Sequence, residues 1–177
     1  MQQSIGLVTR LYVVVTLVVL GLSFGCQQQA QVTITDQEAN ALLEGLLEIW
    51  NEGNFAITED FYTADFVLHD CGVPEDLVGI EAFEGFVTMN RTAFPDFKLT
   101  MDEFFVKGDK MASRWTVTGT QTGPLPDLPP TGKKMQISGL SFYRIANGKF
   151  AEEWLYFNML DFYQQLGFTL VPPKAQK

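Results

Sequence analysis

Residues 119–154 read GTQTGPLPDLPPTGKKMQISGLSFYRIANGKFAEEW, and they predict a loop followed by a pair of strands. The four prolines of this stretch have no amide hydrogen to donate to a sheet, so they predict a loop. Residues 134–145 then alternate with the two-residue period of a strand. Asn147 and Gly148 favour a tight hairpin, because a type I′ turn requires positive φ at both central positions. Residues 150–157 should therefore return antiparallel to residues 134–145.

Large side chains lie on both faces of this predicted hairpin. One face takes Met135, Ile137, Ser141 and Tyr143, and the other takes Ser138, Leu140 and Phe142. A strand pair that is apolar on both faces is expected to be covered on both. One sheet cannot cover both faces with its own helices, so we expect a homodimer that pairs through the second face.

The rest of the chain predicts helices first and strands afterwards. Asp36 begins an amphipathic helix as its N-cap, and Gly53 ends it. The further elements expected are a helical turn at 57–63, a strand at 66–71, a helix at 79–94, strands at 96–106 and 110–120, and a helix at 159–166. Helices followed by an antiparallel meander are typical of an α+β fold.

The order of short motifs resembles the SnoaL-like polyketide cyclase family, also called ester cyclases, within the nuclear transport factor two-like superfamily. The motifs are GTQTG, PPTGKK and YRIANGKFAEEW, preceded by FVLHD, VGIEAFEGFV and RTAFPDFKLTMDEFFVKGDKMASRWTVTGT. Together they span residues 36–167. The resemblance implies a cone-shaped, curved antiparallel sheet wrapped around the N-terminal helices, with an internal pocket.

The resemblance also implies a His-Asp pair, here His69 and Asp70, at a strand end near the pocket. His69 is the only histidine of the chain, and an imidazole that titrates near neutral pH can transfer protons. Adjacent strand residues point to opposite faces, so Asp70 is not expected to orient His69. Two roles stay open for His69: proton transfer in the pocket, or hydrogen bonds that shape a loop.

Two groups that the family's cyclases use are replaced here. Many relatives have a histidine in the segment where this chain has Gln121, and glutamine can bind a carbonyl or hydroxyl group but cannot act as a general base. The cyclases also carry an aspartate on the strand after the PPTG loop, whereas residues 135–143 contain no acid. These replacements weigh against polyketide cyclisation by the family's usual groups.

Glu152 and Glu153 supply another candidate, because one of two adjacent strand residues must face inward. A carboxyl group among aromatic rings has a raised pKa and can act as a base near neutral pH. The candidate catalytic residues are His69 and Glu153, with Glu152 as the alternative glutamate. The candidate substrate-binding residues are Trp50, Trp115, Gln121 and Tyr143.

Metals, cofactors and nucleic acids are not expected. The chain has one histidine and two distant cysteines, without a CxxC or HExxH motif. Its net charge of −9 does not suit phosphate backbones. The expected ligand is a small apolar or carbonyl-containing molecule. The protein is then either an enzyme of the cyclase, isomerase or hydrolase type, or a non-catalytic binding or accessory protein of the cell envelope.

The N-terminus predicts export. Residues 11–22 are apolar apart from Thr16 and Gly21, a run shorter than the ~20 residues of a membrane span and typical of a signal peptide. Small residues before Cys26 resemble a bacterial lipoprotein signal, which implies a lipid anchor at Cys26. We therefore expect a signal peptide (1–25), a lipidated cysteine with a polar tether (26–35), one domain (36–167) and a tail (168–177). An ordinary secretory signal, giving a secreted or periplasmic protein, and an uncleaved anchor are the alternatives.

Replacing Cys26 by serine tests the lipid anchor. The Cys26→Ser variant cannot carry a thioether-linked lipid, so we expect it to move from the membrane fraction to the soluble fraction of the envelope. Unchanged membrane retention after cell fractionation would rule out the anchor.

Overall fold

The computed structural model describes residues 33–126, 128–169 and 171. The predicted signal peptide, Cys26 and most of the predicted tail lie outside these described residues. In chain order, the elements are α2 (Asp36–Glu52), η1 (Phe55–Ile57), α3 (Thr58–Phe61), β1 (Tyr62–Asp70), β2 (Leu77–Val78), α4 (Ile80–Ala93), β3 (Lys98–Lys107), β4 (Lys110–Thr120), β5 (Lys134–Ala146), β6 (Lys149–Phe157) and α5 (Met159–Gln165). None of the helices in the described part is long and apolar enough to cross a membrane.

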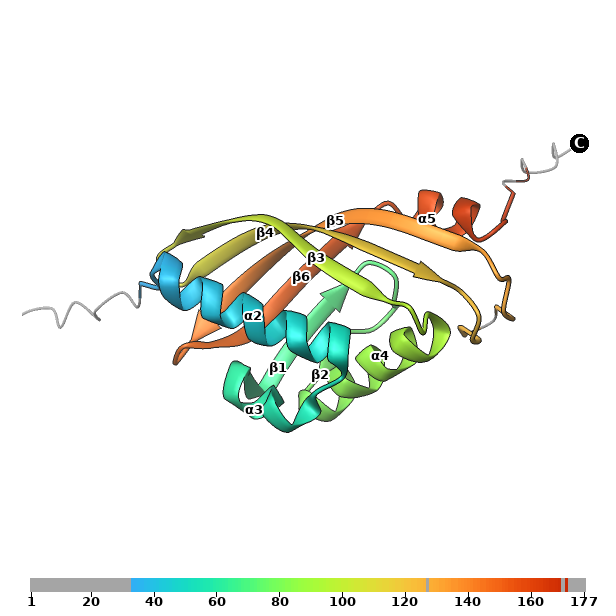
Figure 1. Cartoon of the computed structure of the whole chain (residues 1–177). Coiled ribbons are helices and arrows are strands. Elements are labelled where there is room, and N and C mark those ends of the chain that lie inside the picture. The colour runs from blue at the N-terminus through green and yellow to red at the C-terminus, as the bar shows by residue number, and fades with distance from the viewer. Residues whose placement is uncertain (1–32, 127, 170, 172–177) are drawn as a thin grey trace, which may run out of the picture. The chain divides into compact units, whose positions relative to one another are not determined.

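Six strands form one curved sheet in the order β2-β1-β6-β5-β4-β3, with α2 and α4 on its inner side (Figure 1). The three C-terminal hairpins β3–β4, β4–β5 and β5–β6 are antiparallel, whereas β1 runs parallel to β6. The predicted α+β fold with a curved sheet around helices is therefore confirmed. Strand β1 begins earlier than expected, because Tyr62 already pairs with Phe150.

Helix α2 begins one residue earlier than the sequence predicts. Thr35, not Asp36, is the N-cap, since its backbone is extended and its hydroxyl accepts a hydrogen bond from the Glu38 amide at 3.3 Å. The Glu38 carboxylate accepts one from the Thr35 amide at 2.8 Å in return, which completes a capping box. Gly53, with φ of 71°, ends the helix as expected.

The end of α2 is fixed to its neighbours by polar side chains. Arg91 of α4 donates hydrogen bonds to the carbonyls of Trp50 and Asn51, which lie in the last turn of α2 and lack helical partners. The Asn51 side chain pairs with both backbone groups of Leu99 on β3, at 2.7 and 3.0 Å. These bonds position Trp50 between the helices and the sheet.

The two faces of the β5–β6 hairpin differ as the alternation predicts. Met135, Ile137, Ser141 and Tyr143 are buried on the inner face. On the outer face, Leu140 is 60% exposed and Phe142 is 44% exposed. Phe105 and Tyr156 are also exposed, and Phe105 lies in the same cross-strand row as Phe142 through Ala112. The apolar outer face is thus present, and the homodimer stays a prediction.

Trp115 lies across the inner face because its cross-strand partner is Gly139. A Cβ atom at Gly139 would come within 2.2 Å of the Trp115 ring, so a larger residue there would displace the indole. The indole Nε1 donates to the Ser141 hydroxyl at 3.0 Å. Gly139 and Ser141 together therefore hold this ring against the sheet.

Candidate functional site

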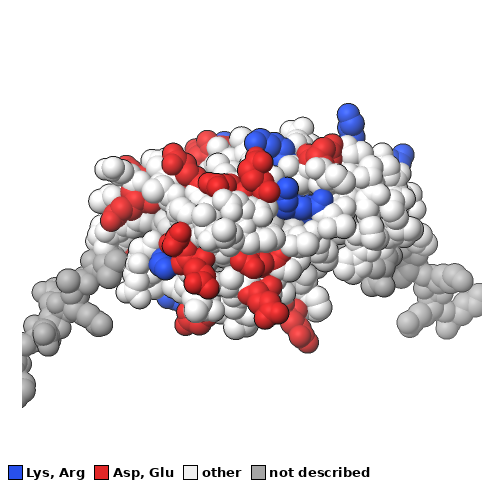
Figure 2. Space-filling view, turned by 60° about the horizontal axis from the view of Figure 1, so that its bottom comes forward, with Lys and Arg blue, Asp and Glu red and all other residues white. Residues whose placement is uncertain are grey.

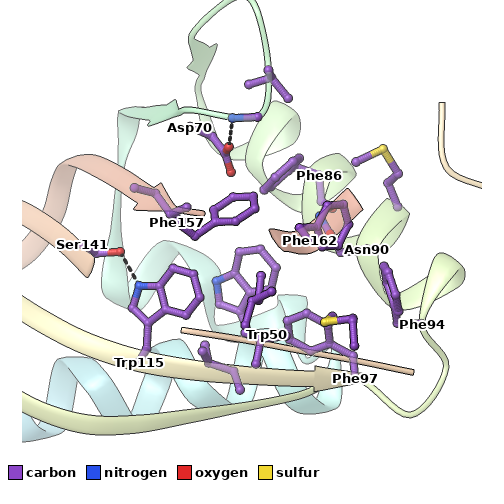
Figure 3. A pocket seen from close by; sticks show the side chains of 18 of the residues that line it. Trp50, Asp70, Phe86, Asn90, Phe94, Phe97, Trp115, Ser141, Phe157 and Phe162 are labelled. Carbon is purple, nitrogen blue, oxygen red and sulfur yellow. Dashed lines mark hydrogen bonds between the residues drawn. The ribbon is translucent and has the colours of Figure 1, made fainter. Parts of the chain in front are cut away.

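A cavity of about 210 Å³ lies between the inner face of the sheet, the helices α2, α4 and α5, and the proline-rich loop after β4. Its walls are mainly aromatic and apolar. Figure 3 shows rings from separate elements that surround the space: Trp50, Phe86, Phe94, Phe97, Phe157 and Phe162. Such a lining favours a largely apolar ligand and leaves its orientation to a few polar groups.

Carboxyl, hydroxyl and amide groups provide the polar part of the lining. They belong to Asp70, Asn90, Ser141, Tyr143, Glu153 and Tyr163. Lysine, arginine and histidine do not occur among the described lining residues. Within the same part of the chain, no cluster of histidine, cysteine or acidic residues could hold a metal ion. The carboxyl groups of Asp70 and Glu153 are the members of this lining that can carry acid–base chemistry.

Glu153 is the most deeply buried charged group of the site, with 3% of its surface exposed. The register places it beside Tyr143 of β5 on one side and Leu68 of β1 on the other. Burial raises its pKa to about 7; hydrogen bonds from the Ser141 and Tyr143 hydroxyls oppose the rise, and the charge of Asp70 adds to it. A carboxyl group with this pKa can both accept and donate a proton at neutral pH.

Asp70 ends β1 and also faces the cavity (Figure 3). The Gly72 amide donates a hydrogen bond of 2.5 Å to its Oδ1. Burial raises the pKa of Asp70, and this hydrogen bond works in the opposite direction by favouring the carboxylate.

Hydroxyl groups surround the buried end of Glu153. The Tyr143 hydroxyl accepts a hydrogen bond from Ser113 at 3.4 Å, and burial, with the nearby charge of Glu153, raises the Tyr143 pKa well above its ordinary value. Tyr143 is therefore a neutral hydrogen-bond donor at physiological pH. The Tyr62 hydroxyl is buried nearby and has no hydrogen-bond partner among the described residues.

His69 does not line the cavity. It lies on the outer face, where its ring stacks on Trp154 with centroids 5.0 Å apart. Its Nδ1 is 2.8 Å from Asp76 Oδ1, and its Nε2 is 3.0 Å from Glu152 Oε1. Burial lowers the pKa of His69, but the bonds and charges of Glu152 and Asp76 outweigh it and raise the pKa above its ordinary value. The geometry thus favours the second role weighed for His69, tying the β1–β2 loop to β6, and its catalytic role stays a prediction.

Gln121 is fully buried but does not line the cavity either. Its Nε2 donates to the carbonyls of Gly123 and Pro129, both at 3.2 Å, and its Oε1 accepts from the Thr131 amide and hydroxyl at 3.1 and 2.6 Å. Gln121 therefore closes the proline-rich loop on itself. Leu125 and Leu128 of that loop line the cavity, so Gln121 acts on the site through the loop.

The structure brings together Trp50, Trp115, Tyr143 and Glu153 of the sequence-derived candidates, and it leaves out His69 and Gln121. In the sequence, Asp70 stands out only as the neighbour of His69. Phe66 and Leu68 are fully buried, and the two-residue period of β1 extends their face to Asp70. That alternation was the signal that could have identified Asp70.

Comparison with known proteins agrees with this architecture. A family model for SnoaL-like polyketide cyclases matches residues 40–166. This chain belongs to the SnoaL-like polyketide cyclase family. The domain is 28% identical over 142 residues to the aklanonic acid methyl ester cyclase DauD of Streptomyces sp. (strain C5), covering 76% of this chain and 84% of DauD.

Solved structures of similar proteins show the same fold as this SnoaL-like domain. TsrD from Streptomyces laurentii superposes with a TM-score of 0.69 and 26% identity, covering 76% of this chain and 98% of TsrD. IdmH from Streptomyces antibioticus superposes with a TM-score of 0.63 and 26% identity, covering 75% and 99% of the two chains. The resemblance drawn from the motifs is thus confirmed.

The raised pKa of Glu153 predicts a pH-dependent cost to stability. The folded protein binds this proton more tightly than the unfolded chain, so the stabilisation is complete below the ordinary pKa of 4.5 and is lost as pH rises through about 7. The Glu153→Gln variant has no group to titrate at this position, so it does not lose this stability. The difference in free energy of unfolding, variant minus wild type, should rise by on the order of 3 kcal/mol between pH 4 and pH 8.

Urea denaturation of both proteins across this pH range measures the difference. A difference between variant and wild type that stays constant with pH would show that Glu153 titrates as an ordinary exposed glutamate.

Proposed function

We propose that this SnoaL-like domain binds a small, largely apolar carbonyl compound in its cavity and transfers protons within it, in a cyclase, isomerase or hydrolase type of reaction. The observation that carries the proposal is the buried Glu153, whose pKa of about 7 suits proton transfer at neutral pH. Its position at the end of an aromatic cavity is what an acid–base group for an apolar substrate requires.

Glu153 offers a substitute for the acid that the cyclases carry on the strand after the PPTG loop. That strand is β5, and Glu153 lies on β6 directly beside Tyr143 of β5. A carboxyl group is therefore present on the inner face, displaced by one strand. The relative named as a methyl ester cyclase supports cyclisation as the reaction type.

The remaining polar groups suit the binding of a carbonyl oxygen. Tyr143 is a neutral donor, and Ser141 is held between the Trp115 indole and the carboxyl group of Glu153. Trp50 and Trp115 supply broad apolar surfaces for the body of the substrate. In this arrangement a carbonyl oxygen near Tyr143 would lie within reach of Glu153.

A non-catalytic binding role is the second candidate. It is favoured by Gln121, which stands where many relatives have a histidine and serves the loop, not the cavity. The same cavity would then hold an apolar ligand without converting it. The two candidates differ only in whether bound ligand exchanges protons with the protein.

We also infer a location in the bacterial cell envelope, with a lipid anchor at Cys26. Acidic side chains are spread over the helix-bearing side of the domain (Figure 2), which supports a partner other than nucleic acid. The envelope location and the lipid anchor are inferred from the N-terminal sequence, residues 1–35.

Proton exchange into a simple ketone tests the catalytic proposal. The probe is 2-tetralone, an apolar bicyclic ketone whose α-hydrogens exchange with D₂O, followed by proton NMR. Wild type should accelerate the exchange, and Glu153→Gln should lower the acceleration by ~10²–10⁴-fold, the usual contribution of a positioned acid or base. Glu103→Gln, the same change on the outer face, is the matched control and should retain the wild-type rate.

Quenching of tryptophan fluorescence separates binding from turnover in the same samples. Binding of 2-tetralone without exchange would favour the non-catalytic role. Full exchange by a folded Glu153→Gln protein would remove Glu153 from the reaction.

The exposed outer face supports the proposal of a homodimer through β4, β5 and β6. Sedimentation should give a dimer at micromolar concentration, and Phe142→Glu should give a monomer because it places a charge at the centre of the apolar row. Thermal melting confirms that the variant is folded. A monomeric wild type would contradict the pairing.

A further inference from the structure

Asp70 is a second carboxyl group in the cavity, and the proposed function does not use it. Strands β1 and β6 run parallel, with Leu68 opposite Glu153 and Asp70 opposite Leu155. Because alternate residues share a face, Asp70 and Glu153 both lie on the inner face of the sheet. Asp70 is two residues further along β1 than Leu68, the residue opposite Glu153. Diagonal neighbours on a sheet face have Cβ atoms about 7 Å apart, so both carboxyl groups can reach one small molecule.

The surroundings of the two carboxyl groups differ. Glu153 is 3% exposed and lies beside the Ser141 and Tyr143 hydroxyls. Asp70 lies at the end of its strand, where the Gly72 amide donates to Oδ1 and stabilises the carboxylate. No described residue donates a hydrogen bond to Asp70 Oδ2, which leaves that oxygen available to a ligand.

No lysine, arginine or histidine lines the cavity around this pair in the described part of the chain. The other titratable groups that line the cavity are Tyr143 and Tyr163, and the charge of Glu153 also acts on the buried Tyr62. Two negative charges in an apolar cavity without a cation repel each other, so the pair is stable when it holds one proton. The shared proton is better placed on Glu153, which is the more deeply buried of the two, than on Asp70, whose carboxylate accepts a hydrogen bond from the Gly72 amide.

We propose that Asp70 and Glu153 form an acid–base pair, in which Asp70 removes a proton from the carbon next to the substrate carbonyl while Glu153 protonates the carbonyl oxygen. This inference rests on the proposed function. In the step, the C–H bond breaks and its proton passes to Asp70 Oδ2. The C–H electron pair forms a C=C bond, the carbonyl π electrons move to oxygen, and that oxygen takes the proton of Glu153.

The step leaves an enol, a protonated Asp70 and an ionised Glu153, so charge and protons balance. In the isomerisation of an unsaturated ketone the enol is a dienol: Asp70 returns its proton to the far carbon of the dienol, the inner double bond shifts, the carbonyl re-forms, and the hydroxyl proton returns to Glu153. In a cyclisation, the enol carbon attacks a second carbonyl group of the same molecule, whose oxygen takes the proton from Asp70 while the enol hydroxyl reprotonates Glu153.

Exchange of 2-tetralone protons with D₂O tests the pair through Asp70→Asn. The rate should fall by ~10²-fold or more, because the amide cannot accept the α-proton. The wild-type rate should also decline above about pH 7, where Glu153 loses its proton. In Asp70→Asn, that decline should move to lower pH, because the negative charge that raises the Glu153 pKa is gone. Asp65→Asn, the same change at an exposed position of β1, should keep the wild-type rate and pH profile.

Asp70→Glu and Asp70→Ser complete the test. Glutamate should restore part of the rate, and serine, whose hydroxyl can still accept from the Gly72 amide, should not. If both folded variants Asp70→Asn and Asp70→Ser keep the wild-type rate and pH profile while Glu153→Gln abolishes exchange, Asp70 is not part of the pair and the proposed function stands. A lower rate with an unshifted pH profile would also overturn the pair, since it would indicate a structural role. If the Asp70 variants and Glu153→Gln all keep the wild-type exchange rate, both proposals are overturned.

Discussion

The register between β5 and β6 determines which glutamate enters the cavity. Tyr143 pairs with Glu153, and Arg144 pairs with Glu152, so one glutamate enters the cavity while the other meets Arg144 and His69 on the outer face. A shift by one residue would exchange these two positions, because the side chains of a strand alternate between faces. The raised pKa of Glu153 and the ion pairs of Glu152 both follow from this single alignment.

The sequence predicts this hairpin but not which residues of its second strand face the cavity. Residues 134–145 alternate clearly, and Asn147 with Gly148 marks the turn, so the two strands and their antiparallel pairing could be derived. Yet Ile145 pairs with Phe150 and Arg144 with Glu152, which leaves Ala151 as an extra residue. Regular alternation from the buried Phe150 would predict that Glu152 faces the cavity. The bulge at Ala151 reverses the alternation, so Glu153 faces the cavity instead. No residue type in this segment indicates a bulge.

The sequence does not identify the hydrogen-bond partners of Gln121 and His69, because the folded chain brings these partners together. Gln121 needs Thr131 at the other end of its loop, and His69 needs Glu152 on a strand that follows 83 residues later. Each holds a loop that contributes to the cavity wall: Leu125 and Leu128 in one case, Gly72 and Val73 in the other. Polar groups outside the cavity thus hold its boundary, while the carboxyl groups of Asp70 and Glu153 line its interior.

A direct measurement of the Glu153 pKa tests whether this carboxyl group is buried in the cavity and exchanges its proton near neutral pH. Carbon NMR of the side-chain carboxyl groups, in protein labelled at glutamate, follows each titration separately across pH 3–9. One resonance should titrate near pH 7, and it should be missing from the Glu153→Gln protein. If every glutamate of the folded wild type titrates near its ordinary pKa of 4.5, Glu153 is not buried in the cavity and does not transfer protons at neutral pH as proposed.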